Sequence, residues 1–264
     1  MKKIATYLAF VVFLAACGRP AVETTPAVSE TADPDISIYA AALDNPLRPE
    51  ADRERDAGRQ PAQVLEFFGI ESGATVLDMF SGGGYYTEML AHVVGDNGHV
   101  VSHMNKPMLA FSGDEFEMRH ADNRLPNVEV LMAENNELDL DADQFDAVIM
   151  TLNYHDLYWE SEEYGWPKIE VENFLAELFE GMKPGATLGI VDHYAVAGAP
   201  SETGSTLHRI DRGIVIAEVE AAGLILDGES DRLRNTDDDR SKSVFDPEVR
   251  GKTDRFILRF KKPE

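Results

Sequence analysis

Residues 75–87 read Thr75-Val76-Leu77-Asp78-Met79-Phe80-Ser81-Gly82-Gly83-Gly84-Tyr85-Tyr86-Thr87. The first five residues predict a short apolar strand, and the tyrosines begin a helix. The three glycines between them let the backbone approach a ligand where a Cβ would clash, and the helix presents free N–H groups to the turn. This is either an ordinary strand-to-helix connection or the ligand-binding turn of an open α/β sheet.

Strand and helix patterns alternate around this turn. A mixed-charge stretch at 52–59 predicts a solvated helix face, and an amphipathic helix runs from Pro61 to a stop at Gly69. Strands separated by helices require right-handed crossovers and a mostly parallel sheet. We therefore predict one α/β domain with a Rossmann-like, doubly wound, seven-stranded, mostly parallel sheet. The further strands are expected at 99–104, 127–132, 145–151, 187–192, from 224 and 255–260, and the further helices at 85–94, 171–182 and 212–222.

The start of the chain predicts export. Two lysines precede an apolar run at 4–16. A helix needs about 20 residues to span a bilayer, so this run is too short to cross one and is typical of a secretory signal. We assign residues 1–16 to a signal peptide, 17–35 to a flexible tether rich in Ala, Thr, Pro and Glu, and 36–264 to the folded domain. Because Cys17 is the sole cysteine, the domain has no internal disulfide.

The residues Leu14-Ala15-Ala16-Cys17 resemble the lipobox of bacterial lipoproteins. That resemblance implies cleavage before Cys17, lipid attachment to its thiol, and a membrane-anchored lipoprotein of the cell envelope that faces the periplasm. A plain secretory signal and a buried N-terminal helix are the alternatives. The sequence does not define the oligomeric state.

Composition and net charge limit the classes of molecule that this protein can bind. Hydrophobic residues make up 44% of the chain, which is enough for a sizeable core, and the net charge is −24. Removal of the leader, which carries two lysines and no acid, makes the chain more acidic by two charges. Such a charge repels nucleic acids and anionic lipid heads, so we expect no nucleic-acid partner and membrane contact only through the lipid.

The order of motifs resembles the class I S-adenosylmethionine (SAM)-dependent methyltransferases over residues 61–263. Asp78 followed by alternating glycines is similar to the first motif of that family, and residues 181–186 are similar to its turn before strand five. More closely, residues 80–88, 153–156, 206–211 and 245–256 resemble a group of predicted methyltransferases of bacterial envelopes. The resemblance implies SAM as cofactor, held by Asp78, Phe80, Ser81, Gly82, Gly84, Asn105, Glu134 and Asn135.

Two positions depart from the pattern of the family. Phe80 replaces the first glycine of the motif, which places a ring beside the expected methionine or ribose of the cofactor. Asn105 stands where the family has an acid that grips the ribose hydroxyls, and an amide makes a weaker hydrogen bond than a carboxylate.

Polar residues after strand four supply candidates for catalysis. Methyl transfer needs a nucleophile held in line with the sulfonium methyl, and an oxygen or nitrogen nucleophile can need a base. We assign His155 as that base with Asp156 orienting it, and Asn153 and Tyr154 as substrate contacts; a polar loop that caps a helix is the alternative. His193, at the end of strand five, is a third catalytic candidate or a surface histidine.

Two further side chains are expected near the substrate. His208 and Arg209 precede the helix at 212–222, and Arg209 would clamp an anion. The histidines and neighbouring acids lack a close ligand spacing such as His-x-x-x-His, so we expect no metal. The aromatic residues of the insertion after strand four form either a lid over an apolar substrate or a local core; they are Tyr154, Tyr158, Trp159, Tyr164 and Trp166.

The sequence therefore predicts a SAM-dependent methyltransferase that acts on a small molecule. The alternative is a non-catalytic ligand-binding or interaction lipoprotein that retained the fold. A hydrolase that uses His155 or His193 is disfavoured because no Gly-x-Ser-x-Gly turn is present.

Overall fold

The computed structural model describes residues 34–264. The predicted signal peptide, Cys17 and most of the tether lie outside the described residues. Three helices precede the sheet, namely α1 (Pro34–Leu43), α2 (Glu50–Arg59) and α3 (Pro61–Phe68). No helix within the described part of the chain is both long enough and apolar enough to cross a membrane.

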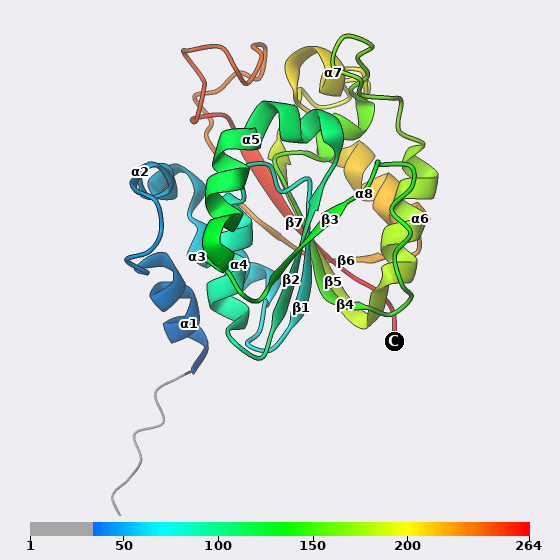
Figure 1. The fold of residues 1–264 in the computed structure, drawn as a ribbon. Helices are drawn as coiled ribbons and strands as arrows, with labels where there is room; N and C mark the ends of the chain where they lie inside the picture. Colours follow the sequence, from blue (N-terminus) through cyan, green and yellow to red (C-terminus); the bar gives the residue numbers. More distant parts are fainter. Residues whose placement is uncertain (1–33) are drawn as a thin grey trace, which may run out of the picture. The chain divides into compact units, whose positions relative to one another are not determined.

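A seven-stranded sheet forms the centre of the molecule, with the order β3-β2-β1-β4-β5-β7-β6 (Figure 1). The first five strands in the chain pair in parallel, whereas β7 is antiparallel to both β5 and β6. The predicted seven-stranded α/β class is confirmed, and the sheet is mixed because β7 returns without a helical crossover. The strands are β1 (Thr75–Met79), β2 (His99–Met104), β3 (Val128–Met132), β4 (Phe145–Thr151), β5 (Met182–His193), β6 (Ile225–Ser230) and β7 (Arg255–Lys261).

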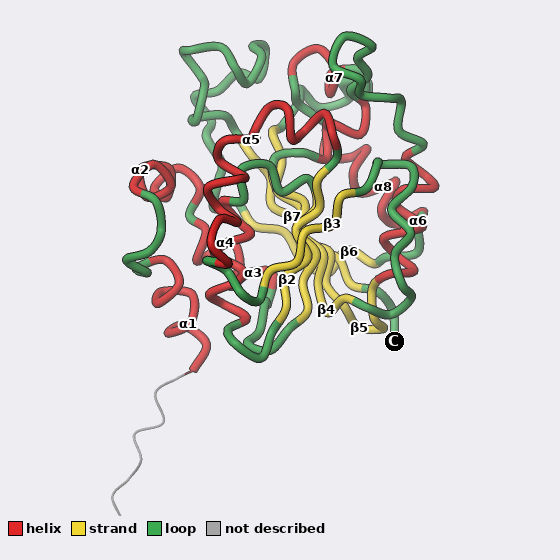
Figure 2. The backbone as a smooth tube through the Cα atoms, viewed as in Figure 1, coloured by secondary structure: helices red, strands yellow, loops and turns green. Residues whose placement is uncertain are grey.

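Helices cover both faces of the sheet (Figure 2). One apolar core packs α3 and α4 against alternate residues such as Val76, and the other packs α6 and α8 against Leu77 and Met79. This division follows from the period of two in a strand, which sends successive side chains to opposite faces. The helices after β1 are α4 (Tyr85–Val94), α5 (Lys106–His120), α6 (Val171–Gly181), α7 (Thr203–Leu207) and α8 (Arg212–Ala221), with 3₁₀ turns η1 (Ala121–Asn123) and η2 (Tyr154–Tyr158).

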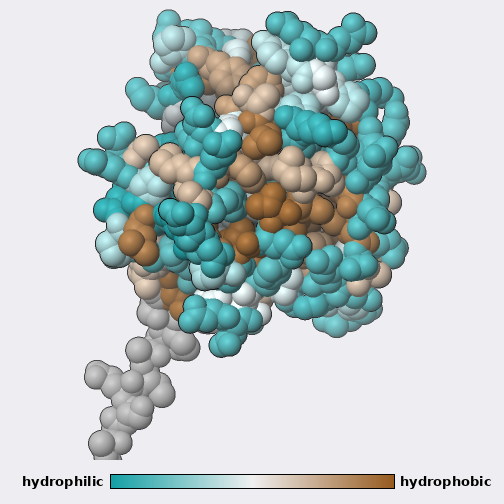
Figure 3. All heavy atoms as spheres, in the orientation of Figure 1, coloured by the Kyte–Doolittle hydropathy of each residue, from teal (hydrophilic) through white to brown (hydrophobic). Residues whose placement is uncertain are grey.

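The predicted bounds at 85–94, 99–104 and 145–151 agree with α4, β2 and β4. Helix α5 is missing from the prediction because its apolar residues do not follow a helical period and most of its surface remains accessible. Strand β5 begins at Met182, so residues 183–185, which the resemblance placed in the turn before strand five, are part of the strand. Hydrophobic surface is visible among hydrophilic residues in Figure 3, and the exposed large apolar side chains include Phe111, Met118 and Met132.

The packing of α3 on the sheet gives a stability prediction. A Cβ on Gly189 of β5 would lie 2.5 Å from the Phe68 ring, so we expect Gly189→Ala to destabilise the protein by about 1–3 kcal/mol through overpacking. Gly113→Ala in α5 is the matched control, because its Cβ meets nothing within 4 Å and alanine favours a helix. Urea unfolding measures both; equal stabilities for Gly189→Ala and the wild type would contradict this packing.

Candidate active site

The glycine turn joins β1 to α4 through left-handed backbone. Phe80, Gly82 and Gly84 have φ angles of 51°, 57° and 75°. The Ser81 amide donates to the His103 carbonyl of β2 at 3.0 Å, which ties the turn to the neighbouring strand. An ideal Cβ on Gly82 would meet nothing within 4 Å, so the missing side chain leaves space beside the turn.

The first cavity, here called the turn cavity, lies where β1 and β4 end at the glycine turn. Its volume is about 240 Å³. Asn153 contributes a side chain whose Nδ2 donates to the Met79 carbonyl at 2.8 Å, while its Oδ1 is buried and has no hydrogen-bond partner within residues 34–264. The lining residues are Arg55, Arg59, Phe80, Ser81, Gly82, Gly83, Tyr85, Tyr86, Met108, Glu115, Thr151, Leu152, Asn153 and Asp156.

A second cavity, here called the arginine cavity, shares Arg55, Arg59 and Leu152 with the turn cavity. Its volume is about 470 Å³. The shared residues make the two cavities neighbours at the carboxyl edge of the parallel strands, where open α/β sheets bind ligands. The lining residues are Glu54, Arg55, Gly58, Arg59, Leu152, His193, Val244, Phe245, Arg250, Gly251 and Arg255.

Three guanidinium groups of the arginine cavity, those of Arg59, Arg250 and Arg255, form no ion pair with an acid among the described residues. Within residues 34–264 no acid forms an ion pair with Arg59 or Arg255; Arg59 lies 4.4 Å from the Tyr85 ring centroid, and Arg255 donates to the Gly58 carbonyl at 3.0 Å. Burial lowers the pKa of both groups, and repulsion between neighbouring arginines lowers it further. The site therefore holds uncompensated positive charge in a protein of net charge −24.

The structure brings the predicted His155 and His193 together around Asp192, with ring centroids 5.8 Å apart. His155 is buried, and its Nδ1 donates to Asp192 Oδ1 at 2.7 Å. Burial favours the neutral imidazole, but the carboxylates of Asp192 and Asp156 outweigh it and raise the pKa of His155 to about 9. A histidine that is protonated at neutral pH cannot accept a proton, so the geometry disfavours His155 as the base.

His193 has the opposite electrostatic environment. Its Nδ1 forms a hydrogen bond with Thr253 Oγ1 at 2.6 Å, and its side chain lines the arginine cavity. Burial, and then the positive charge of Arg255 and the other neighbours, hold the pKa of His193 well below its usual value. The imidazole is therefore neutral at pH 7 and can receive a hydrogen bond from an acceptor hydroxyl.

Three predicted cofactor contacts are buried in the fold. Asp78 accepts a hydrogen bond from the Thr87 hydroxyl at 2.7 Å. Asn105 caps α5 through the Met108 amide and donates to Asn135 Oδ1 at 2.8 Å. All three side chains are at most 1% exposed, and none of them lines the turn cavity. Asp78 Oδ1 and Asn135 Nδ2 are buried without a hydrogen-bond partner among the described residues, and the cofactor contacts predicted for Asp78, Asn105 and Asn135 stay predictions.

The remaining predicted cofactor residues divide between two cavities. Phe80, Ser81 and Gly82 line the turn cavity, and Gly84 sets the start of α4. The Phe80 ring stacks on Phe174 in the core, with ring centroids 5.8 Å apart, and the predicted position of this ring beside the cofactor stays a prediction. Glu134 lines a separate cavity of about 640 Å³ with Lys106, Pro107, Ala110, Asn136, Glu137, Tyr164, Gly165 and Pro167, on the other side of the first turn of α5.

Two predicted substrate contacts are structural. Tyr154 is fully buried, and its hydroxyl donates to Glu218 of α8 at 2.7 Å. Arg209 is also fully buried and pairs with Asp238 at 2.9 Å, so it cannot clamp an anionic substrate. The aromatic insertion is mainly a local core, since Trp166 is 2% exposed, while Tyr164 remains exposed. Asn153 and Asp156 do line the turn cavity, and His208 lies beside Asp156.

The arginines of α2 are the functional candidates that the sequence interpretation missed. The mixed-charge stretch was predicted to be a solvated face, but Asp52 is 2% exposed and accepts from Arg119 of α5 at 2.6 Å. Arg119 also pairs with Glu88 and donates to the Gly83 carbonyl at 2.9 Å. These contacts hold α2 against the glycine turn, so Arg55 and Arg59 face the cavities.

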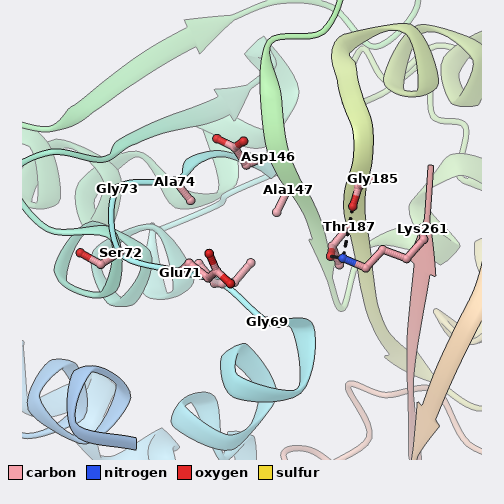
Figure 4. Close-up of a pocket in the computed structure, with 11 residues that line it drawn as sticks. Gly69, Glu71, Ser72, Gly73, Ala74, Asp146, Ala147, Gly185, Thr187 and Lys261 are labelled. Atoms are coloured by element: carbon pink, nitrogen blue, oxygen red, sulfur yellow. Dashed lines mark hydrogen bonds between the residues drawn. The ribbon is translucent and has the colours of Figure 1, made fainter. Parts of the chain in front are cut away.

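A further cavity, of about 350 Å³, lies at the amino ends of the parallel strands, opposite to the ends that carry the glycine turn (Figure 4). It is lined by residues near the beginning of the parallel strands, such as Ala74, Asp146 and Thr187, together with Lys261 near the end of β7. The Lys261 ammonium donates to Thr187 Oγ1 at 2.8 Å. None of the residues that line the turn cavity or the arginine cavity also lines this one.

Comparisons with known proteins agree with this architecture. The family model of protein-L-isoaspartate (D-aspartate) O-methyltransferase matches residues 37–154. A crystal structure of a SAM-dependent methyltransferase from Aquifex aeolicus is 25% identical and has a TM-score of 0.52, with 76% of this chain and 89% of that chain covered. A search of curated proteins gives no match.

Two more distant structures share the fold. A SAM-dependent methyltransferase from Mesorhizobium loti is 13% identical, with a TM-score of 0.53 over 77% of this chain and 97% of that chain. The [4+2]-cyclase SpnF is 18% identical, with a TM-score of 0.55 over 78% of this chain and 81% of that chain. The family match and the similarity to the Aquifex aeolicus enzyme together support the class, a SAM-dependent methyltransferase, and S-adenosylmethionine as its cofactor.

The residues of the turn cavity fit such a cofactor in two respects. The space beside Gly82 admits a ligand close to the backbone, and the unpartnered Asn153 Oδ1 offers a buried acceptor.

The buried acid under the turn gives a pH prediction. Burial raises the pKa of Asp78 from its usual 3.8 to about 7, although hydrogen bonds from Thr87 oppose this. The unfolded chain releases this proton near pH 4 and the folded chain only near 7, so Asp78 lowers stability as the pH rises through that window. We expect the stability of Asp78→Asn relative to wild type to increase between pH 4 and 8, measured by urea unfolding. The exposed Asp96→Asn serves as control; a pH-independent difference for Asp78→Asn would contradict the assignment.

Proposed function

We propose that this protein transfers a methyl group from SAM to a small anionic molecule. The observation that carries the proposal is the junction of the turn cavity and the arginine cavity at Arg55, Arg59 and Leu152. In the turn cavity a ligand can approach the backbone closely, and the arginine cavity provides positive charge and a neutral histidine. Two such neighbouring compartments suit a cofactor and its methyl acceptor.

On the cofactor side, bound SAM supplies an electrophilic methyl on a sulfonium sulfur. The chain contributes the glycine turn, which allows close approach at Gly82, and the Asn153 side chain, which is anchored to the Met79 and Phe80 carbonyls at 2.8 and 3.3 Å. An anchored side chain is a precise positioning group, because its rotamer is fixed before the ligand arrives. Its Oδ1 is buried without a hydrogen-bond partner among the described residues, so it is an acceptor available beside the cavity that Asn153 lines.

On the acceptor side, the four arginines of the arginine cavity select a negative charge. Guanidinium groups bind carboxylates and phosphates in a bidentate geometry, and such hydrogen bonds are stronger than neutral ones. A bound anion would also offset the mutual repulsion of Arg59 and Arg255. The volume of about 470 Å³ suits a small molecule rather than a folded protein.

His193 is the candidate that would receive the acceptor proton. It lines the same cavity as the arginines, and its Nδ1 is held by Thr253. An acceptor hydroxyl would form a C–O bond to the methyl group while the sulfur–methyl bond breaks, with S-adenosylhomocysteine as the leaving group, and its proton would pass to the neutral imidazole of His193. Asp156, from the predicted catalytic set, lies on the turn-cavity side and is close to the two other histidines.

The cofactor assignment is tested by calorimetry with SAM and S-adenosylhomocysteine. We expect the wild type to bind both ligands. Gly82→Val should lose at least about 1.4 kcal/mol of binding free energy, which is a tenfold weaker Kd, because the valine side chain fills the space beside the turn. Gly198→Val is the matched control, since Gly198 also has a positive φ and open space but lies outside both cavities. Absence of binding to the wild type at millimolar ligand would exclude the methyltransferase assignment.

The acceptor class is tested with inorganic phosphate and succinate on the protein saturated with S-adenosylhomocysteine. We expect Arg59→Gln to weaken binding of at least one of these anions by about tenfold, through loss of a charge-assisted hydrogen bond worth 1.5–3 kcal/mol. Arg232→Gln, which removes an exposed arginine outside the cavities, should leave the affinity unchanged. Equal anion affinities in wild type and Arg59→Gln would contradict an anionic acceptor at this cavity.

A non-catalytic ligand-binding protein is the second candidate. Asn105, at the position where the family has its ribose-binding acid, is buried as a helix cap, and this favours a changed or lost cofactor role. Formation of S-adenosylhomocysteine from SAM in the presence of a cell-envelope extract would support the enzyme. SAM binding without that product would support the second candidate.

We also propose that the protein is anchored in a bacterial envelope through lipid on Cys17, facing the periplasm. The support is the sequence Leu14-Ala15-Ala16-Cys17 after a basic and apolar leader. We expect Cys17→Ser to yield uncleaved precursor or soluble protein, because the variant lacks the thiol that carries the lipid. Cell fractionation and mass measurement test this; cleaved Cys17→Ser protein that fractionates with membranes as the wild type does would contradict the anchor.

A further inference from the structure

Three side chains that are distant in the sequence converge beside the turn cavity. His155 and Asp156 belong to η2, and His208 follows α7. One potential ligand atom from each of the three lies within 4.8 Å of the other two, which makes them a group that could hold a metal ion. We expected no metal from the sequence because residues 155 and 208 are too far apart to form a recognisable ligand motif.

The two distances within this group suit metal ligands better than hydrogen bonds. Asp156 Oδ1 lies 3.3 Å from His155 Nε2 and 3.4 Å from His208 Nδ1. A charge-assisted hydrogen bond is about 2.7–2.9 Å long, the length that His155 Nδ1 reaches with Asp192. Two ligands held about 2.1 Å from a tetrahedral Zn²⁺ lie about 3.4 Å apart.

Asp192 fixes the ring of His155 in the orientation that a metal ligand needs. Its Oδ1 receives the Nδ1–H of His155 at 2.7 Å, and its Oδ2 receives the His155 backbone N–H at 2.8 Å. A carboxylate that holds one imidazole nitrogen as a donor leaves the other nitrogen to carry the acidic proton, which a metal ion displaces when it binds. His155 Nε2, which faces Asp156, is therefore the available ligand atom.

His208 is held toward the same point by its backbone and by a neighbouring ring. Its φ of 53° is left-handed, a backbone conformation that is uncommon for residues other than glycine. The Phe245 ring packs against the imidazole with centroids 4.7 Å apart. His208 Nδ1 is buried and has no hydrogen-bond partner among the described residues, so it is an unused donor or acceptor aimed at Asp156.

We propose that His155 Nε2, Asp156 Oδ1 and His208 Nδ1 bind one divalent transition-metal ion, for which Zn²⁺ is the best match. Two imidazoles and one carboxylate form a ligand set suited to zinc, and three protein ligands leave a fourth position open. Asp156 lines the turn cavity, so the open position would be accessible to a ligand there. A role of the ion as Lewis acid toward the methyl acceptor rests on the proposed function, whereas metal binding itself does not.

The test measures metal binding directly on purified, untagged protein. Co²⁺, whose visible absorption reports its coordination, is titrated first and then displaced with Zn²⁺. We expect one ion per chain, and at least about 100-fold weaker Zn²⁺ binding in His208→Ala and in Asp156→Asn. His99→Ala is the matched control, because it removes a histidine that also lies beside an acid, Glu129, at 3.1 Å but on the surface.

Thermal unfolding gives a second readout, because an ion that binds only the folded state raises its Tm. We expect Zn²⁺ to raise the Tm of the wild type and of His99→Ala, but not that of Asp156→Asn, which retains the shape of the side chain. The proposal is overturned if the wild type binds no stoichiometric Co²⁺ or Zn²⁺, or if Asp156→Asn and His208→Ala both bind them as the wild type does. Loss of metal binding with retained SAM binding would separate this site from the cofactor site.

Discussion

The arrangement of the site depends on the buried guanidinium of Arg119. This group pairs with Asp52 of α2 and Glu88 of α4, and its Nε donates to the Gly83 carbonyl. Both acids are buried, and without Arg119 they would keep only Arg55, for Asp52, and Arg124, for Glu88, as arginine partners. Partial loss of pairing at a buried acid destabilises the fold by more than the net value of the ion pair. One side chain of α5 thereby fixes the glycine turn and the helix that carries Arg55 and Arg59.

Charged side chains in this acidic protein are paired where they support the fold, and some at the candidate site have no ion-pair partner among the described residues. Acids and bases neutralise one another where they support the fold, as in the pairs of Arg119 and of Arg209. Arg59 and Arg255 are the contrasting case: the charge of Arg59 lowers the pKa of Arg255, and neither group forms an ion pair within the described part of the chain. Around Asp192 the two histidines take opposite states, since His155 faces carboxylates and His193 faces guanidinium groups. The charge of the surroundings therefore changes from negative at His155 to positive at His193 over the short distance between the two rings.

Much of the fold was predictable because its signals are local. The strands at 99–104 and 145–151 and the helix at 85–94 are continuous patterns with turn residues at their ends, and they form as predicted. The glycine turn was also recognisable, since its left-handed positions at Gly82 and Gly84 favour glycine. Helix α5 was not predictable from periodicity, although Asn105 followed by a proline at the helix start is a local signal that could have revealed it.

The candidate site was only partly predictable, because residue type does not reveal which way a side chain faces. Asn153, Asp156 and His193 were found from their positions after strand ends, yet Tyr154 and Arg209 from the same segments are buried against Glu218 and Asp238. The sequence by itself determined the strand order along the chain, the ligand-binding turn and the acidic character. The tertiary structure alone decided that α2 supplies arginines to the site and that His208 meets His155 and Asp156, because contacts between distant segments arise only when the sheet and its covering helices assemble.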